Sequence, residues 1–184
     1  SVPAPYNYPV RVQMNGAFYQ LAFHSDVIGK EQIERMGYEP TGALYKAVGN
    51  LVPNFSSTGV FQKLEPEDDP SRKDYLELAN GINEASSLAV RRAAVFDLLD
   101  IPQAINHLAG SRWCAENDDV WANMSLYRDT YGDGLWRCIP FDMNASWGQL
   151  YGGSNPLEAT ADWSKSHPLY GGSSTGGNFN RLYD

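Results

Sequence analysis

Two short strand-like runs, joined by a turn rich in glycine and aspartate, constrain the fold of this chain more than any other feature. The runs cover residues 124–128 and 135–139, and the turn between them reads Asp-Thr-Tyr-Gly-Asp-Gly. Because Asp-Gly and glycine-rich connections favour β-hairpins, we predict a hairpin here. A hairpin brings its two ends together, so the polar side chains that flank the runs should converge on one patch: Asp118, Asp119, Asn123, Asp142 and Asn144.

The oxygen atoms of such a patch suit a hard divalent cation, which takes carboxylate and carboxamide ligands and completes its shell with water or phosphate. A plainer interpretation is that these Asp and Asn residues cap helices and start turns. Asn123 has a further alternative, because Asn-Met-Ser fits the acceptor pattern for N-glycosylation. The pattern alone leaves all three interpretations open.

The first 60 residues predict a β-rich region. Asn15-Gly16 separates two alternating apolar and polar runs, 8–14 and 18–24, and is a strong hairpin signal. A short helix is expected over 29–37, with Ile33 and Met36 on its inner face, followed by a strand over 43–48.

Residues 71–153 predict a helical lobe that carries the polar hairpin, and residues 154–184 an irregular tail. Within the lobe, residues 88–109 predict two successive helices broken near Asp100, which we expect to cap the second one. We expect Phe96, Leu99 and Leu108 to face inward. The whole chain is therefore expected to form a single α+β domain.

Composition excludes several classes of partner. Lys and Arg number 14 against 22 Asp and Glu, which gives a net charge of −8 and a pI near 4.8. Nucleic acids and anionic membranes both require clustered cations, so we expect neither as a partner. No apolar run approaches the ~18 residues that cross a bilayer, so no membrane span is expected. The chain lacks an initiator Met and a signal peptide, and we expect it to be a fragment of a longer protein.

The two cysteines, Cys114 and Cys138, flank the predicted hairpin. A disulfide between them is conceivable in an oxidising compartment, but buried free thiols are favoured. Five Trp, 11 Tyr and 17 Gly lean toward a secreted or surface protein.

The polar hairpin also resembles a known family. An acid, a carboxamide five residues later, a hairpin and then Pro-Phe-Asp-Met-Asn-Ala-Ser-Trp-Gly are similar to the catalytic stretch of the spore-coat-protein-H (CotH) family of atypical protein kinases. Three further segments resemble the family in the same order: 10–23, 41–46 and 96–109. The resemblance runs from about 10 to 153. It implies an atypical kinase-like fold, with a partial N-terminal β-region followed by a helical lobe carrying a catalytic β-hairpin.

The activity implied by the resemblance is transfer of the γ-phosphoryl group of ATP to Ser or Thr hydroxyls of a secreted or coat protein, with Mg²⁺. The location implied is extracellular or on the cell or spore surface. The catalytic base would be Asp118 or Asp119, which a one-residue shift in alignment exchanges. The remaining implied roles are metal binding by Asn123, Asp142 and Asn144, and cofactor binding by Phe141, Tyr45, Lys46 and Asp26.

Three positions depart from the family pattern. Phe141 stands where the family usually has Trp, Asn144 where it usually has a second Asp, and Asp26 where it commonly has Glu. Because of the departures at Asn144 and Asp26, a pseudokinase that has the fold but no catalytic turnover remains an alternative. Another alternative is a secreted surface or carbohydrate-binding module with exposed aromatic side chains and a structural metal site.

Overall fold

Mixed strands and helices make up the fold, which confirms the predicted α+β class. The computed structural model describes residues 2–47, 61–83, 85–114, 116, 123–143 and 146–147. In chain order the elements are β1 (Asn7–Met14), β2 (Ala17–Ser25), α1 (Lys30–Arg35), β3 (Ala43–Lys46), β4 (Gln62–Glu65), α2 (Lys73–Gly81), α3 (Leu88–Leu98), α4 (Ile101–Trp113), β5 (Met124–Arg128) and β6 (Trp136–Pro140).

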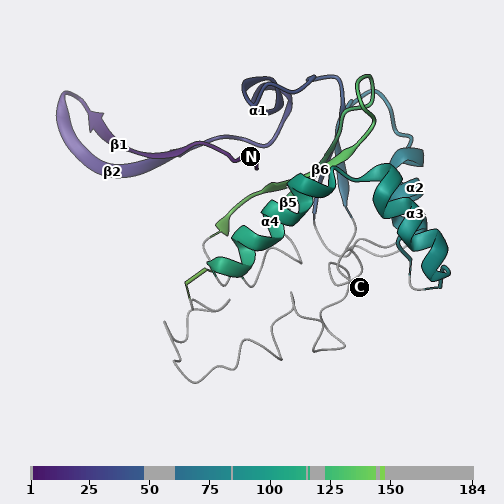
Figure 1. Cartoon of the computed structure of the whole chain (residues 1–184). Coiled ribbons are helices and arrows are strands. Elements are labelled where there is room, and N and C mark those ends of the chain that lie inside the picture. Colours follow the sequence, from purple (N-terminus) through teal and green to yellow (C-terminus); the bar gives the residue numbers. More distant parts are fainter. Residues whose placement is uncertain are drawn as a thin grey trace.

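Strands β1 and β2 form an antiparallel ribbon of their own. Its turn is the Asn-Gly pair, and both residues have positive φ, 53° at Asn15 and 79° at Gly16. This conformation matches the twist of a tight hairpin and confirms the prediction from the sequence. The ribbon extends away from the other elements (Figure 1), and most of its side chains are exposed.

The second sheet is antiparallel, with strand order β4-β3-β5-β6. The predicted polar hairpin forms its β5–β6 half, with register from Met124 opposite Pro140 to Arg128 opposite Trp136. Gly42 precedes β3, where an added Cβ would lie 2.6 Å from the carbonyl oxygen of Arg128. The close approach of the two backbones therefore requires glycine at this position.

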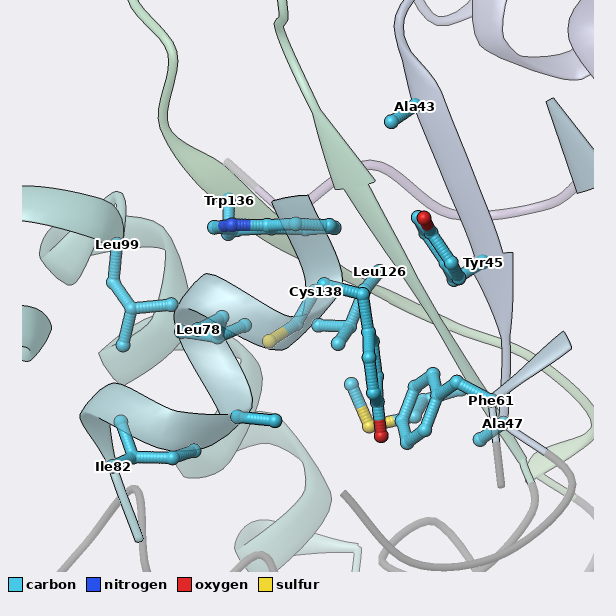
Figure 2. Close-up of a cluster of buried hydrophobic side chains, with 13 residues drawn as sticks. Ala43, Tyr45, Ala47, Phe61, Leu78, Ile82, Leu99, Leu126, Trp136 and Cys138 are labelled. Carbon is cyan, nitrogen blue, oxygen red and sulfur yellow. The ribbon is translucent and has the colours of Figure 1, made fainter. Parts of the chain in front are cut away.

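The main core lies between one face of this sheet and helices α2, α3 and α4. Figure 1 shows α2 beside α3, and α4 lies against β6. Alternate strand residues enter this core, since successive side chains of a strand point to opposite faces. Figure 2 shows the cluster. Its buried residues from the sheet are Ala43, Tyr45, Met124, Leu126, Trp136 and Cys138, and Ala47, directly after β3, joins them.

A smaller core lies on the other face of the sheet, where α1 packs. Ile33 is buried against Leu44, Tyr127 and Ile139, and Met36 packs at the edge of the cluster. The prediction that Ile33 and Met36 face inward is confirmed. The β3 residues Leu44 and Tyr45 therefore serve different cores, as the alternation of a strand requires.

The break between α3 and α4 lies where the sequence predicts it. The carboxylate of Asp100 accepts a hydrogen bond of 3.1 Å from the backbone N–H of Gln103, which caps α4. Leu99 is 4% exposed, and Leu108 packs against the core, as predicted. The prediction that Phe96 faces inward is wrong, because this residue is 61% exposed. The α3 side chains that pack on the core are Ala94, Val95 and Leu98.

Gln103 joins α4 to the edge strand β6. Its side-chain oxygen accepts a hydrogen bond of 2.9 Å from the backbone N–H of Cys138, and its amide nitrogen donates to the carbonyl of the same residue. Cys138 and Cys114 are both free thiols, as predicted, but only Cys138 is buried, and Cys114 is partly exposed. Among the described helices, none is long and apolar enough to cross a bilayer.

Candidate functional site

The candidate site lies at the open end of the β5–β6 hairpin, where Asn123 precedes β5 and Asp142 follows β6. The backbone N–H of Phe141 donates to the carbonyl of Asn123 at 2.9 Å. The side-chain amide of Asn123 donates in turn to the carbonyl of Asp142, also at 2.9 Å. The hairpin therefore brings Asn123 and Asp142 together, as expected from its geometry.

Asp142 has a left-handed backbone conformation, with φ of 51°. For a residue other than glycine this conformation is uncommon and costs on the order of 1 kcal/mol or more. The hydrogen bond from Asn123 to its carbonyl offsets part of that cost. The Asp142 side chain is exposed, which leaves its carboxylate accessible to a ligand.

Next to this turn is a cavity of about 600 Å³. One wall is the segment that follows β6, and the other is formed by the chain before β1 and by the end of β2. The residues that line the cavity are Ala4, Pro5, Tyr6, Asn7, Ser25, Asp26, Pro140, Phe141, Asp142 and Met143. Three side chains that were predicted from different parts of the sequence thus share one cavity: Asp26, Phe141 and Asp142.

The carboxylate of Asp26 is held on its wall by two partners. It accepts a hydrogen bond of 2.6 Å from the backbone N–H of Tyr6 and forms an ion pair with Arg35. The guanidinium of Arg35 also lies 3.6 Å from the centre of the Tyr6 ring. A cation therefore compensates the charge of Asp26 beside the cavity.

Lys46 reaches the same region from β3. Its ammonium lies 5.0 Å from the centre of the Phe141 ring, a distance typical of a cation–π contact. Lys46 is therefore next to a residue of the cavity wall. Its own side chain does not belong to the lining.

Tyr45 is placed away from the cavity, although it precedes Lys46. Its side chain is fully buried in the main core, where the ring stacks on Tyr75 at a centroid distance of 5.5 Å. Its hydroxyl donates to Asp74 at 2.7 Å. Burial, and then the hydrogen bond to Asp74, raise the pKa of Tyr45 above its ordinary value. The structure therefore brings Lys46, but not Tyr45, next to the cavity wall.

The expected catalytic residues Asp118 and Asp119 and the expected metal ligand Asn144 lie outside the described residues. In the part of the chain that is described, no three His, Cys, Asp or Glu side chains gather closely enough to hold a metal ion. The donor set that is described there consists of the exposed carboxylate of Asp142 and the amide of Asn123. It fits Mg²⁺, which binds proteins through one or two carboxylates and takes phosphate and water for the rest.

Tyr6 and Arg35 also belong to this region, and no sequence pattern pointed to them. Arg35 lies nine residues beyond Asp26, and Tyr6 lies before β1, so no short motif links them. The glycosylation interpretation of Asn123 is not favoured, because the side chain is only 9% exposed and its amide is hydrogen bonded.

Comparison with known proteins identifies one family. A family model described as CotH kinase protein matches residues 1–174 of the 184 residues. A search of curated proteins finds no match.

Proposed function

This chain belongs to the CotH kinase family, and from that membership we propose that it transfers the γ-phosphoryl group of ATP to Ser or Thr hydroxyls of a protein substrate. The family itself indicates a kinase-like function. The observation that carries the proposal is the cavity shared by Asp26, Phe141 and Asp142, which stand at positions of the family pattern, with Asp26 in place of Glu and Phe141 in place of Trp.

In this proposal Asp142 and Asn123 hold Mg²⁺. When bound, Mg²⁺ neutralises the charge that develops on the phosphoryl group. The accessible carboxylate of Asp142 supplies the negative charge for the cation. Asn123 has two proposed roles. Its side-chain nitrogen donates to the Asp142 carbonyl, which fixes the turn. Its side-chain oxygen is the proposed metal ligand. We propose Asn144 as a further ligand of this group.

The cations of the site are proposed to balance the phosphates. Lys46 stands over Phe141, and Arg35 stands against Asp26. Such positive groups are needed because a nucleotide triphosphate would otherwise meet carboxylates on both walls of the cavity. The Phe141 ring in the cavity wall is proposed to stack on the adenine base.

The attacking hydroxyl needs a carboxylate that accepts its proton and orients it. We propose Asp118 or Asp119 for this role, because Asn123 follows Asp118 by the spacing of a kinase catalytic loop. The atypical kinase-like arrangement of lobes is part of the same proposal. So is a substrate on a cell or spore surface, which fits the association of the family with the spore coat.

The test is phosphate transfer from radiolabelled ATP, including autophosphorylation, by the intact protein and its Asp142→Asn variant. The substitution keeps the shape of the side chain but removes the charge that attracts the cation. Transfer should fall by at least ~10²-fold, since about 3 kcal/mol or more of transition-state electrostatics is lost. Thermal stability without metal should stay level.

A matched control is Asp68→Asn, which removes the same charge from an exposed position in the acidic segment after β4. This control should leave transfer unchanged. Full activity in Asp142→Asn would contradict the metal role of Asp142. Absence of transfer by the wild-type protein would contradict the kinase proposal itself.

One observation favours the binding-module alternative. The β1–β2 ribbon exposes Tyr8, Phe18, Tyr19 and Phe23, and such aromatic rings suit contact with carbohydrate or another surface. In that case Ca²⁺ should raise the melting temperature, Asp142→Asn should abolish the increase, and ATP with Mg²⁺ should have no effect.

A further inference from the structure

The segment that follows β6 is connected to the end of α4 by contacts that the proposed chemistry does not use. The hydroxyl of Ser146 donates to the carboxylate of Glu116 at 2.7 Å. The backbone N–H of Trp147 donates to the carbonyl of Cys114 at 2.6 Å. The rings of Trp147 and Trp113 meet edge to face, with centroids 5.1 Å apart. Two segments that are distant in sequence are thus joined at three points.

The contact between Ser146 and Glu116 is the buried one of the three. Glu116 is 0% exposed and Ser146 is 7% exposed. A carboxylate at this depth is costly to bury unless hydrogen-bond donors surround it. Burial also raises the pKa of the neighbouring Cys114 thiol. The Ser146 hydroxyl is one of the donors that this buried carboxylate needs.

The same hydroxyl also lies against the turn that carries Asp142. Ser146 contacts the carbonyl of Met143, the residue next to Asp142. On its other side, Asp142 is held by the amide of Asn123. The short segment is thus anchored at one point by Asn123, which precedes β5, and at another by Glu116, which follows α4 and binds Ser146.

The backbone of the segment needs such anchors. Asp142 and Trp147 both have left-handed conformations, with φ of 51° and 57°. Residues other than glycine adopt this conformation when surrounding contacts over-determine it. Without the contact between Ser146 and Glu116, one of the anchors that hold these two residues would be lost.

We infer that Ser146 is a positioning residue, which holds the Asp142 turn through Glu116, three residues after the end of α4, and thereby aims the Asp142 carboxylate at the cavity. The inference rests on the proposed role of Asp142 in binding Mg²⁺. Glu116 precedes Asp118 by two residues in sequence, so this bond connects the two segments from which the proposed site is built. Ser146 itself is not proposed to contact the nucleotide or the metal.

Loss of this positioning should be measurable, because a small displacement of a group in an active site changes the kinetics strongly. A shift of ~1 Å can reduce the rate by ~10²-fold. Ser146→Ala removes the donor and releases the turn. We expect the apparent KM for Mg²⁺ to rise by at least ~10-fold, with a smaller change in kcat, since the group that is displaced, the Asp142 carboxylate, is the proposed ligand of the cation. Ser146→Thr keeps the hydroxyl and should restore the wild-type KM.

Ser125→Ala is the matched control. Ser125 is a serine of β5 that is 1% exposed, and its hydroxyl has no hydrogen-bond partner within the described part of the chain. Its removal should leave the KM for Mg²⁺ unchanged. A general effect of trimming a buried serine would appear in both variants, whereas a positioning effect appears only at Ser146.

A second measurement separates this inference from the kinase proposal. Hydrogen–deuterium exchange of the intact protein without ligands reports the turn directly. In Ser146→Ala, the amides of residues 141–143, 146 and 147 should exchange at least ~5-fold faster, since a buried hydrogen bond is lost, while β3 and β5 should be unchanged. Where Ser146→Ala is not obtained folded, Glu116→Gln, which weakens the same bond, should change exchange in the same direction by a smaller factor.

The outcomes are distinct. Absence of phosphate transfer by the wild-type protein overturns the kinase proposal, and the exchange data still decide whether Ser146 holds the turn. Unchanged exchange of residues 141–143, 146 and 147 overturns the positioning role, whatever the activity. Faster exchange with an unchanged KM for Mg²⁺ in an active enzyme also overturns it, because the turn then moves without consequence for the ligand.

Discussion

Two buried glutamines offer a direct comparison of the same side chain with and without hydrogen-bond partners. Gln103 is 5% exposed, and both polar atoms of its amide bond the backbone of Cys138. Gln32 in α1 is 3% exposed, and neither polar atom of its amide has a partner among the described residues. We therefore expect opposite effects when each is replaced by leucine, which has a similar volume and no polar group.

The magnitudes follow from the hydrogen bonds. A buried hydrogen bond contributes about 0.5–1.5 kcal/mol net, and a buried group left without its partner costs about 1–3 kcal/mol. Gln103→Leu removes two such bonds at the edge strand β6 and should lower the free energy of unfolding by about 2–4 kcal/mol. Gln32→Leu removes an amide that is desolvated without compensation. The free energy of unfolding of Gln32→Leu should therefore stay level or rise by up to ~2 kcal/mol.

The assay is equilibrium urea unfolding followed by circular dichroism, together with thermal melts. At roughly 2–4 °C per kcal/mol for a chain of this size, Tm should fall on the order of 10 °C for Gln103→Leu. Tm of Gln32→Leu should be unchanged or higher. Equal losses of stability in both variants would refute the reasoning, because packing rather than hydrogen bonding would then dominate at both positions.

Two further predictions concern the core and its pH dependence. Leu99→Ala should lower the free energy of unfolding by about 2–5 kcal/mol, the range for a buried leucine, whereas Phe96→Ala should change it by less than about 1 kcal/mol. Urea unfolding of both variants checks this, and equal effects would show that Phe96 packs in the core. Burial is the main cause that raises the pKa of Tyr127 from 10.0 to about 12. The folded state therefore keeps the phenolic proton of Tyr127 to a higher pH than the unfolded chain does. The contribution of Tyr127 to the free energy of unfolding is complete below about pH 10 and is lost as the pH rises through about 12. The free energy of unfolding, measured at about pH 8, 10 and 11, should decline with pH in the wild-type protein and decline less in Tyr127→Phe. An equal decline in the two proteins would contradict this prediction.

Local elements were largely predictable because their causes are local. The Asn-Gly turn of β1–β2, the turn of β5–β6 and the Asp100 cap of α4 depend on a few neighbouring residues whose backbone preferences are strong. The meeting of Asn123 with Asp142 follows from the hairpin alone. Family membership likewise rested on motifs that stand in sequence order.

Side-chain orientation was less predictable where two faces of an element compete. Phe96 is apolar and stands at helical spacing, yet α3 directs Ala94, Val95 and Leu98 at the core and leaves Phe96 outside. A helical pattern with apolar residues on several sides does not determine which side is covered.

The sequence by itself determined the α+β class, the family and the hairpin that joins Asn123 to Asp142, because each of these follows from short segments of chain. Only the tertiary structure decided which side chains share the cavity. Tyr45 and Lys46 are neighbours in one motif, but strand alternation sends Tyr45 into the core and Lys46 to Phe141. Arg35, Asp26 and Tyr6 meet through the packing of α1 beside the base of the β1–β2 ribbon. Contacts of this kind depend on where separate elements dock, and no local pattern in the chain encodes that position.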